Sequence, residues 1–437
     1  MSEKTQSAPT GITSYQVWAL VALTFLNMQD GFDILAISYA ANAIATNWDI
    51  SRGALGIVLS ASLFGMMIGA MTLSPLADKF GRRTITVVGL ILSGIGMLIA
   101  MSAGSIELLI AGRVITGLGI GGILASVNTL VAEFAGEKYR STAIAIFQLG
   151  FPMGAFLSGF LVAWLLDIGT WRHVFAFGAL SSFIFIPIVL LLPESMEYLA
   201  KSGKPDALRR INNIRAKLRQ PALHALPVAI DQPRSSMLAN ILTLFNREYA
   251  LRTALIWASF FLLLTTLYFM LSWIPKILVD TGFTEAQGNQ GGRLINLVGM
   301  LGIVVMGVLS LRVQSPLVTS VYLVMLAGMM FLLSITPLEI SSVLIVIGLI
   351  GFFLHGSMIG LYATVPTLYP ASIRATGTGW AIGLSRFGAV LGPAMAGYLL
   401  EAGWAPRNLL QVFAIPAGLA AVTVFLLWQA QRRVNPS

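Results

Sequence analysis

The chain has 437 residues, of which 57% are hydrophobic and 10% are charged. Soluble domains average about 45–50% apolar and about 25% charged residues. The composition therefore predicts an integral membrane protein and argues against a soluble enzyme, a nucleic-acid-binding protein or a disordered scaffold. The chain contains no cysteine, which excludes structural disulfides and thiolate metal sites.

Twelve hydrophobic segments are long enough to be transmembrane helices. Such a helix needs about 20 apolar residues to cross a hydrocarbon core about 30 Å thick. Some segments contain no ionisable residue, and the others qualify if one or two charges are tolerated. In chain order the predicted spans are 15–42, 53–77, 84–106, 107–131, 141–166, 174–193, 253–275, 292–311, 313–338, 340–366, 376–400 and 408–431.

The positions of the charges predict the orientation and the division of the chain. Loops assigned to the inside hold most of the 27 Lys and Arg residues, as cytoplasmic loops do, so both termini are expected in the cytoplasm. The long polar stretch after the sixth span divides the twelve into six and six. We therefore predict an all-α membrane protein with an N-terminal bundle over 1–192, a cytoplasmic linker over 193–250 and a C-terminal bundle over 251–437.

An internal repeat supports two parallel halves. Three positions of the first half match three of the second at one constant offset, and these pairs are Arg140 with Arg374, Thr142 with Thr376, and Gly154 with Gly388. Parallel halves place the substrate site between them, near the bilayer midplane.

The loop after the second span carries a cluster of charges, with Asp78, Lys79, Gly81, Arg82 and Arg83. An acid at a helix end and two arginines behind a flexible glycine can form a breakable charge network. We predict that this cluster, with Arg140 and Arg374, latches one conformation. The alternative is that these charges only orient the loop, although Asp78 has no such role.

Two acids lie within the first span. Asp30 and Asp33 are three residues apart and share one helix face. An ionisable side chain within a span costs at least about 2.5–3.5 kcal/mol on insertion scales and is a functional candidate by default. Two acids this close cannot both ionise easily in a poorly hydrated site, which suits proton coupling by Asp30 and Asp33. The alternative is a buried ion pair that orients the helix.

The charged loop resembles the signature loop of the major facilitator superfamily, with Ser74 and Lys79 in place of its usual Gly and Arg. The Asp30-Gly-Phe-Asp33 segment and the segment from Tyr369 to Pro393 are similar to the aromatic acid:proton symporter family within that superfamily. This resemblance implies the major facilitator fold and import of a benzoate-type anion with protons. It also implies functional roles for Asp30, Asp33 and Arg386.

Two arginines within spans are candidates independently of the resemblance. Arg386 lies about 15 Å into its span at 1.5 Å per residue, and a guanidinium binds a carboxylate through two parallel hydrogen bonds. We predict that Arg386 binds the substrate, the alternative being a salt bridge to a buried acid. Arg113 is expected at the depth of the first-span acids, so we infer a pair with Asp33 or Asp30 that protonation or substrate can loosen. The glycines from Gly112 to Gly122 predict close helix packing.

Other candidates carry weaker signals. His355 changes charge within the physiological range and could relay protons, although a lone histidine on an apolar helix is more often structural. Four aromatic residues could stack on a ring substrate, or could serve as interfacial anchors. They are Tyr268, Trp273, Tyr362 and Trp380.

The leading hypothesis is a proton symporter that imports an aromatic or related carboxylate by alternating access, with one proton or two. The alternatives are a proton-coupled multidrug exporter and a receptor that senses an aromatic acid. The chain has no Gly-x4-Gly-Lys-Ser/Thr motif, so an ion gradient must supply the energy. We expect a monomeric, multi-pass protein of the bacterial inner membrane that is not an enzyme. Its partners should be the lipid bilayer and the organic anion, with a proton as coupling ion and no other cofactor, metal, nucleotide or nucleic acid.

Overall fold

The computed structural model describes residues 12–226 and 237–434. The N-terminal half contains α1 (Ser14–Trp48), α2 (Arg52–Phe80), α3 (Arg82–Ser102), α4 (Ile106–Ile168) and α5 (Trp171–Leu191). The C-terminal half contains α9 (Ala250–Asp280), α10 (Glu285–Leu309), α11 (Ser315–Ile335), α12 (Ile340–Thr364), α13 (Ala371–Glu401) and α14 (Pro406–Val434). Between the halves lie α6 (Met196–Lys201), α7 (Ala207–Lys217) and α8 (Met237–Leu244).

The predicted bundle boundaries at 192 and 251 fall just after α5 and at the start of α9. Parts of all three predicted domains, namely 1–11, 227–236 and 435–437, lie outside the described residues.

The fourth and fifth predicted spans join without the loop expected over 132–140. The chain is helical through this stretch apart from Gly136, which has φ 70° and ψ 170°. Glycine adopts positive φ without steric cost, so a single residue breaks the helical path between two spans. The prediction of a loop here was wrong because one glycine is enough to separate the two helices.

Twelve helical segments make up the membrane-spanning part. Within the described residues, eleven are long and apolar enough to cross a membrane, counting the two arms of α4 separately. The twelfth is α13, which contains Arg386 and packs against α2 and α9. The predicted all-α fold with twelve membrane helices is therefore confirmed.

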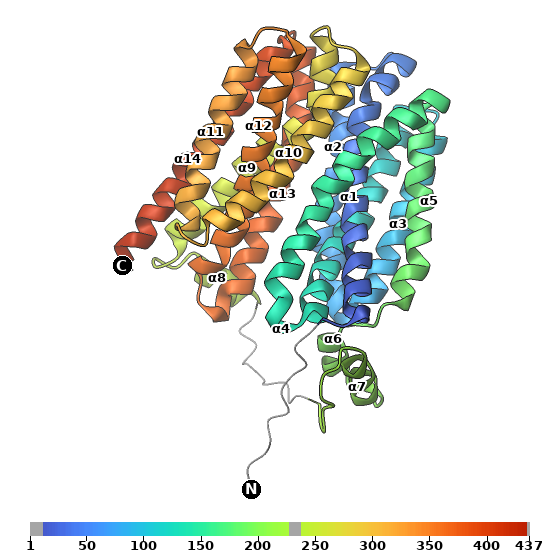
Figure 1. Cartoon of the computed structure of the whole chain (residues 1–437), viewed down its shortest axis with the longest axis vertical. Helices are drawn as coiled ribbons and strands as arrows, with labels where there is room; N and C mark the ends of the chain where they lie inside the picture. The colour runs from blue at the N-terminus through green and yellow to red at the C-terminus, as the bar shows by residue number, and fades with distance from the viewer. Residues whose placement is uncertain (1–11, 227–236, 435–437) are drawn as a thin grey trace.

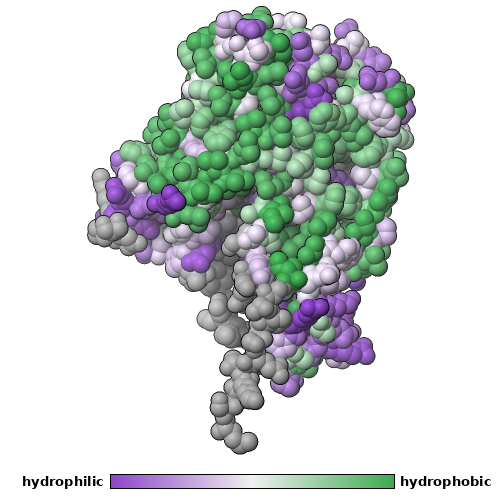
Figure 2. All heavy atoms as spheres, viewed as in Figure 1, coloured by the Kyte–Doolittle hydropathy of each residue, from purple (hydrophilic) through white to green (hydrophobic). Residues whose placement is uncertain are grey.

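The surface and the chain path agree with a protein that crosses a bilayer. Figure 2 shows hydrophobic residues over the middle of the molecule and hydrophilic residues gathered toward its ends. Helix α1 begins and α14 ends toward the end of the bundle that carries α6, α7 and α8 (Figure 1). The start of α1 and the end of α14 thus lie on the same side as the linker helices.

Close helix contacts hold the N-terminal half together. A Cβ placed on Gly117 would collide with the backbone of Ser62, and one on Gly121 would collide with the backbone of Met66. The glycines of α4 therefore let α2 approach its backbone directly. The two halves in turn meet where α2 packs against α13, α4 against α10 and α1 against α9.

Candidate functional site

Asp33 is held in a buried ion pair on the inner side of α1. Arg113 on α4 donates to its carboxylate, and a second bond from Arg113 Nη2 reaches Oδ2 at 3.2 Å. The Ser62 hydroxyl on α2 donates to Oδ2 at 2.8 Å. Both charged side chains are 1% exposed. Two pairings were inferred for Arg113, and the structure contains the one with Asp33. Together with the bond from Ser62, this ion pair joins α1, α2 and α4.

Asp30 is placed differently from Asp33. It is 6% exposed, and its Oδ1 has no hydrogen-bond partner among the described residues. The guanidinium of Arg386 and the carboxylate of Asp33 are its charged neighbours. Asp30 belongs to the N-terminal half and Arg386 to the C-terminal half, so these opposite charges interact electrostatically between the halves.

Two tyrosines surround Arg386 within the C-terminal half. The guanidinium Nη1 donates to the Tyr268 hydroxyl at 3.2 Å, and Tyr362 is a further electrostatic neighbour of Arg386. The Tyr362 ring packs edge-on against Phe260, with 5.6 Å between the ring centroids. Asp30, Arg386, Tyr268 and Tyr362 thus form the central cluster of the candidate site. It presents a guanidinium, a carboxylate and phenol groups, which are suited to a small organic acid.

The other two aromatic candidates bond to or stack on residues outside this cluster. Trp273 is fully buried, and its indole Nε1 donates to the Pro393 carbonyl at 3.0 Å. That contact joins α9 to α13 and favours a structural role. Trp380 stacks on Trp257, with 6.1 Å between the ring centroids. Their predicted contacts with substrate stay predictions.

His355 is enclosed between helices of the C-terminal half. Its ring packs against Gly299 of α10, where a Cβ would collide with it. In the part of the chain that the structure describes, its Nε2 has no hydrogen-bond partner. The proton relay through His355 stays a prediction.

The charged loop after α2 forms a network, centred on Arg82. This arginine contacts Glu133 on α4, donates to the Ser195 hydroxyl at 2.9 Å and to Glu197 at 2.7 Å, and lies 3.6 Å from Asp78. The contacts join α2, α3 and α4 to α6. The network therefore ties the N-terminal half to the linker.

The flanking residues extend this network to the end of α5. The Arg83 backbone N–H donates to Glu194 at 2.9 Å, and the Arg83 side chain donates to the Leu192 carbonyl at 3.1 Å. Gly81 has φ 104° and lies against the Glu194 carboxylate. A residue with a side chain would be strained at this φ and would also meet Glu194.

The remaining latch candidates make weaker contacts. The Asp78 side chain is 78% exposed, Lys79 lies over the Phe80 ring at 5.4 Å, and Arg374 donates to the Tyr369 carbonyl at 3.4 Å. Arg140 is exposed. None of these contacts joins the two halves, so the latch role of the cluster stays a prediction.

Sequence reasoning missed several residues that complete these sites. They are Ser62 beside Asp33, and Glu133, Glu194, Ser195 and Glu197 around Arg82 and Arg83. Buried charges need compensating partners, so three acids near two buried or half-buried arginines were a usable signal. A serine in an apolar helix gives no such signal.

The two halves contact each other at the end remote from α6, α7 and α8. Within 12–226 and 237–434, the polar contacts between the halves lie in this part of the bundle. Asn42 contacts Glu285, and Arg52 lies 3.6 Å from Asp280, which also pairs with Lys276 at 2.5 Å. The molecule is therefore closed at this end.

Serine hydroxyls add two contacts between the halves. Ser38 on α1 donates to the carbonyls of Leu271 at 3.0 Å and Ser272 at 2.7 Å. Pro275 cannot donate to the Leu271 carbonyl one helical turn earlier, so Ser38 satisfies a carbonyl that the proline leaves free. Ser60 on α2 likewise donates to the Val390 carbonyl of α13 at 2.9 Å.

Among the described residues, no three His, Asp or Glu side chains gather in a way that could hold a metal ion.

Comparisons with known proteins identify related chains over nearly the whole length. The model of the Major Facilitator Superfamily matches residues 20–381. A gallate transporter of Pseudomonas putida is 31% identical over 98% of this chain and 95% of its own length. A 4-hydroxybenzoate transporter of Pseudomonas aeruginosa is 30% identical over 95% of this chain and 93% of its own. The solved structure of the xylose transporter XylE from E. coli has a TM-score of 0.74 at 15% identity and covers 95% of this chain and 98% of its own, which supports the fold.

Proposed function

Because the chain belongs to the major facilitator superfamily and is a membrane transporter rather than an enzyme, we propose that it imports an aromatic carboxylate together with a proton. The gallate and 4-hydroxybenzoate transporters among its relatives support this substrate class. The observation that carries the proposal is Asp30, a buried and incompletely bonded carboxylate that interacts electrostatically with Arg386 of the other half.

The charges of the site provide a reason for coupling. Asp33 and Arg113 neutralise each other within the N-terminal half, and Asp30 and Arg386 balance across the interface. A bound carboxylate adds a negative charge, which is unfavourable in a site of low dielectric constant. A proton on Asp30 restores neutrality and frees Arg386 to bind the substrate. This balance favours one proton per monovalent substrate.

Each side chain has a defined role in this scheme. Arg386 binds the substrate carboxylate through two parallel hydrogen bonds. Tyr268 positions the guanidinium because its hydroxyl accepts a hydrogen bond from Arg386 Nη1. Asp30 carries the proton. Asp33 and Arg113 hold α1, α2 and α4 together, so their role is structural. Asp30 is then the acid that binds and releases the proton.

The direction of the cycle follows from the proposed orientation. With the Lys- and Arg-rich linker in the cytoplasm, the closed end is the outer one. Proton and substrate bind from the outside, and the neutral loaded site allows the halves to rock to this state. Each ligand shifts the equilibrium only through its different affinity for the two states. The proposed setting is the inner membrane of a bacterium, with a single chain supplying both halves of the site.

Uptake into proteoliposomes tests the proposal. Wild-type protein should accumulate a labelled benzoate-type acid when the outside is made acidic. Asp30→Asn should lose accumulation but keep exchange of internal for external substrate, because a neutral side chain mimics the protonated site. Asp49→Asn is the matched control, since Asp49 is the exposed residue that follows α1.

The same assay separates the alternatives. Accumulation by Asp30→Asn at the wild-type level would refute the role of Asp30. Efflux of substrate driven by the proton gradient, in place of uptake, would instead indicate an exporter.

A further inference from the structure

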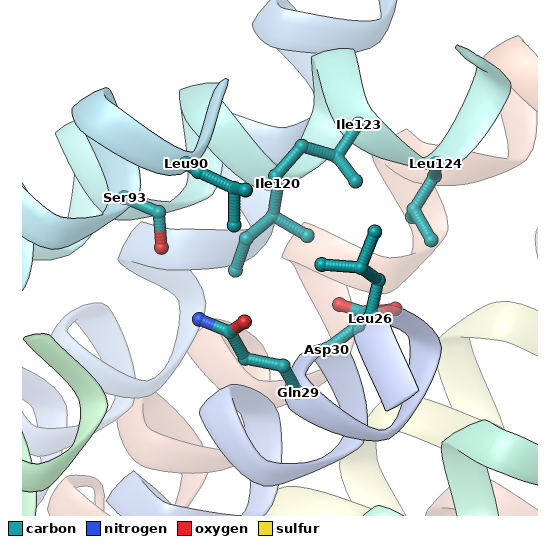
Figure 3. A pocket seen from close by; sticks show the side chains of 8 residues that line it. All are labelled: Leu26, Gln29, Asp30, Leu90, Ser93, Ile120, Ile123 and Leu124. Carbon is teal, nitrogen blue, oxygen red and sulfur yellow. The ribbon is translucent and has the colours of Figure 1, made fainter. Parts of the chain in front are cut away.

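A small cavity lies beside Asp30 within the N-terminal half. It is lined by α1, α3 and α4 and has a volume of about 10 Å³, which is close to the space that one water molecule requires. Most of its lining is apolar, and Figure 3 shows the three polar side chains that reach it. The lining residues are Leu26, Gln29, Asp30, Leu90, Ser93, Ile120, Ile123 and Leu124.

Two oxygen atoms of this lining are buried and unbonded. Asp30 Oδ1 and Gln29 Oε1 both lack a hydrogen-bond partner in the described part of the chain. Buried polar atoms are normally bonded to protein or to ordered water. An amide oxygen and an ionised carboxylate oxygen are both acceptors and cannot bond each other. A donor with two O–H groups would satisfy both atoms.

The orientation of the Gln29 amide is fixed from the opposite side. Its Nε2 donates to the Ser182 hydroxyl of α5 at 2.5 Å, and Ser182 in turn donates to the Gly178 carbonyl at 2.9 Å. The amide nitrogen therefore bonds Ser182, and the amide oxygen is the atom available for a hydrogen bond in the cavity. Ser93 of α3 lies 3.4 Å from Ser182, and in Figure 3 its hydroxyl points toward Gln29. Ser93 thus supplies a third polar group at the cavity wall.

We propose that this cavity is a water-binding site through which Asp30 exchanges its proton. The water donates one hydrogen bond to Asp30 Oδ1 and one to Gln29 Oε1, and Ser93 bonds its oxygen. A hydronium ion reaching the cavity gives its proton to Asp30 and leaves a neutral water and a neutral carboxyl group. On release the carboxyl group returns the proton to the water, which carries it away as hydronium.

The charges around Asp30 agree with this assignment. Its other charged neighbours are Arg386 and Asp33, and Asp33 is already paired with Arg113. The substrate is proposed to bind on the Arg386 side, in contact with the C-terminal half. The cavity lies among helices of the N-terminal half, so the proton and the substrate would approach Asp30 from different sides. This inference rests on the proposed role of Asp30 in proton symport.

Two variants in proteoliposomes test the water site. Gln29→Met removes the acceptor, together with the amide N–H that bonds Ser182, while nearly keeping the side-chain length. Ser93→Ala removes only the hydroxyl. Each should slow proton-driven uptake about tenfold, the effect of losing one hydrogen bond. Substrate exchange, which needs no net proton release, should stay near the wild-type rate. The slowed uptake should also show a solvent deuterium isotope effect that exchange lacks. Ser181→Ala is the matched control, because the Ser181 hydroxyl bonds the Gly178 carbonyl but does not line the cavity.

The outcomes separate this inference from the proposed function. Wild-type uptake in both variants overturns the water site alone. Equal loss of uptake and exchange in both overturns it too, because that pattern indicates a packing role. A wild-type protein that shows no proton-driven uptake of any aromatic acid overturns both the proposed function and the water site. Selective loss of uptake, with the isotope effect, supports the site.

Discussion

Replacing Arg113 by methionine should leave the Asp33 carboxylate charged and unpaired inside the N-terminal half. Both side chains are 1% exposed, so water cannot replace the lost partner. Removing one member of a buried ion pair costs about 3–5 kcal/mol, and Ser62 can supply only one remaining bond to Oδ2. We expect the free energy of unfolding to fall by about this amount, and by about 1.5–3 kcal/mol for Ser62→Ala, which removes one hydrogen bond to a charged group.

A double-mutant cycle makes this prediction specific. Replacing both members of a buried pair by apolar residues is often neutral or stabilising, so Asp33→Leu combined with Arg113→Met should be more stable than either single variant. Unfolding by SDS in mixed micelles, followed by circular dichroism, measures all four proteins. The reasoning is refuted if each single variant loses less than about 1 kcal/mol, as for an exposed pair, or if the losses in the double variant simply add.

Three further changes follow from the structure. Asp280→Asn weakens the contacts between the halves at the closed end, so a single engineered cysteine there should react faster with a thiol reagent, and an unchanged rate would argue against a closed gate. Hydrogen bonds led by that from Lys201 hold the pKa of Glu197 below its usual range. The stabilisation is therefore present above pH about 4.3 and is lost as the pH falls through the lowered pKa, so the difference in stability between wild type and Glu197→Gln should vanish in acid and persist at neutral pH. Trp273→Phe should cost about 0.5–1.5 kcal/mol through the lost bond to Pro393, with an unchanged order of preference among substrates in a competition assay; a changed order would indicate contact with substrate.

Much of the fold was accessible from the sequence because a bilayer imposes simple rules. Length and hydropathy located the spans, and Arg386 did not obscure α13 once a buried charge was tolerated. The expected loop over 132–140 failed because Gly136 alone separates two helices. Hydropathy indicates which residues lie in lipid, but it does not predict how many residues separate two consecutive helices.

The candidate site was predictable in its charged members and less so in its partners. Asp30, Asp33, Arg113 and Arg386 stand out because each charge in an apolar helix is expensive. From the sequence, either Asp30 or Asp33 could be the ion-pair partner of Arg113, because residues three apart on a helix lie at nearly the same depth. Only the packing of α1 against α4 separates them: it pairs Asp33 with Arg113 and leaves Asp30 outside that pair.

Neutral side chains carry no comparable signal. The bond from Ser38 to a carbonyl freed by Pro275 requires two helices from different halves in one register. The acids around Arg82 come from α4 and α6, which are far apart in the chain. Such contacts depend on tertiary geometry that spacing and composition do not encode.

One proton should accompany each substrate anion into a site whose charges otherwise balance. Calorimetric titration of purified protein with a benzoate-type acid, in two buffers of different ionisation enthalpy, measures the protons taken up on binding. The wild type should take up about one proton per substrate at neutral pH, and Asp30→Asn should take up none. Binding without proton uptake in the wild type, or undiminished uptake in Asp30→Asn, would contradict it.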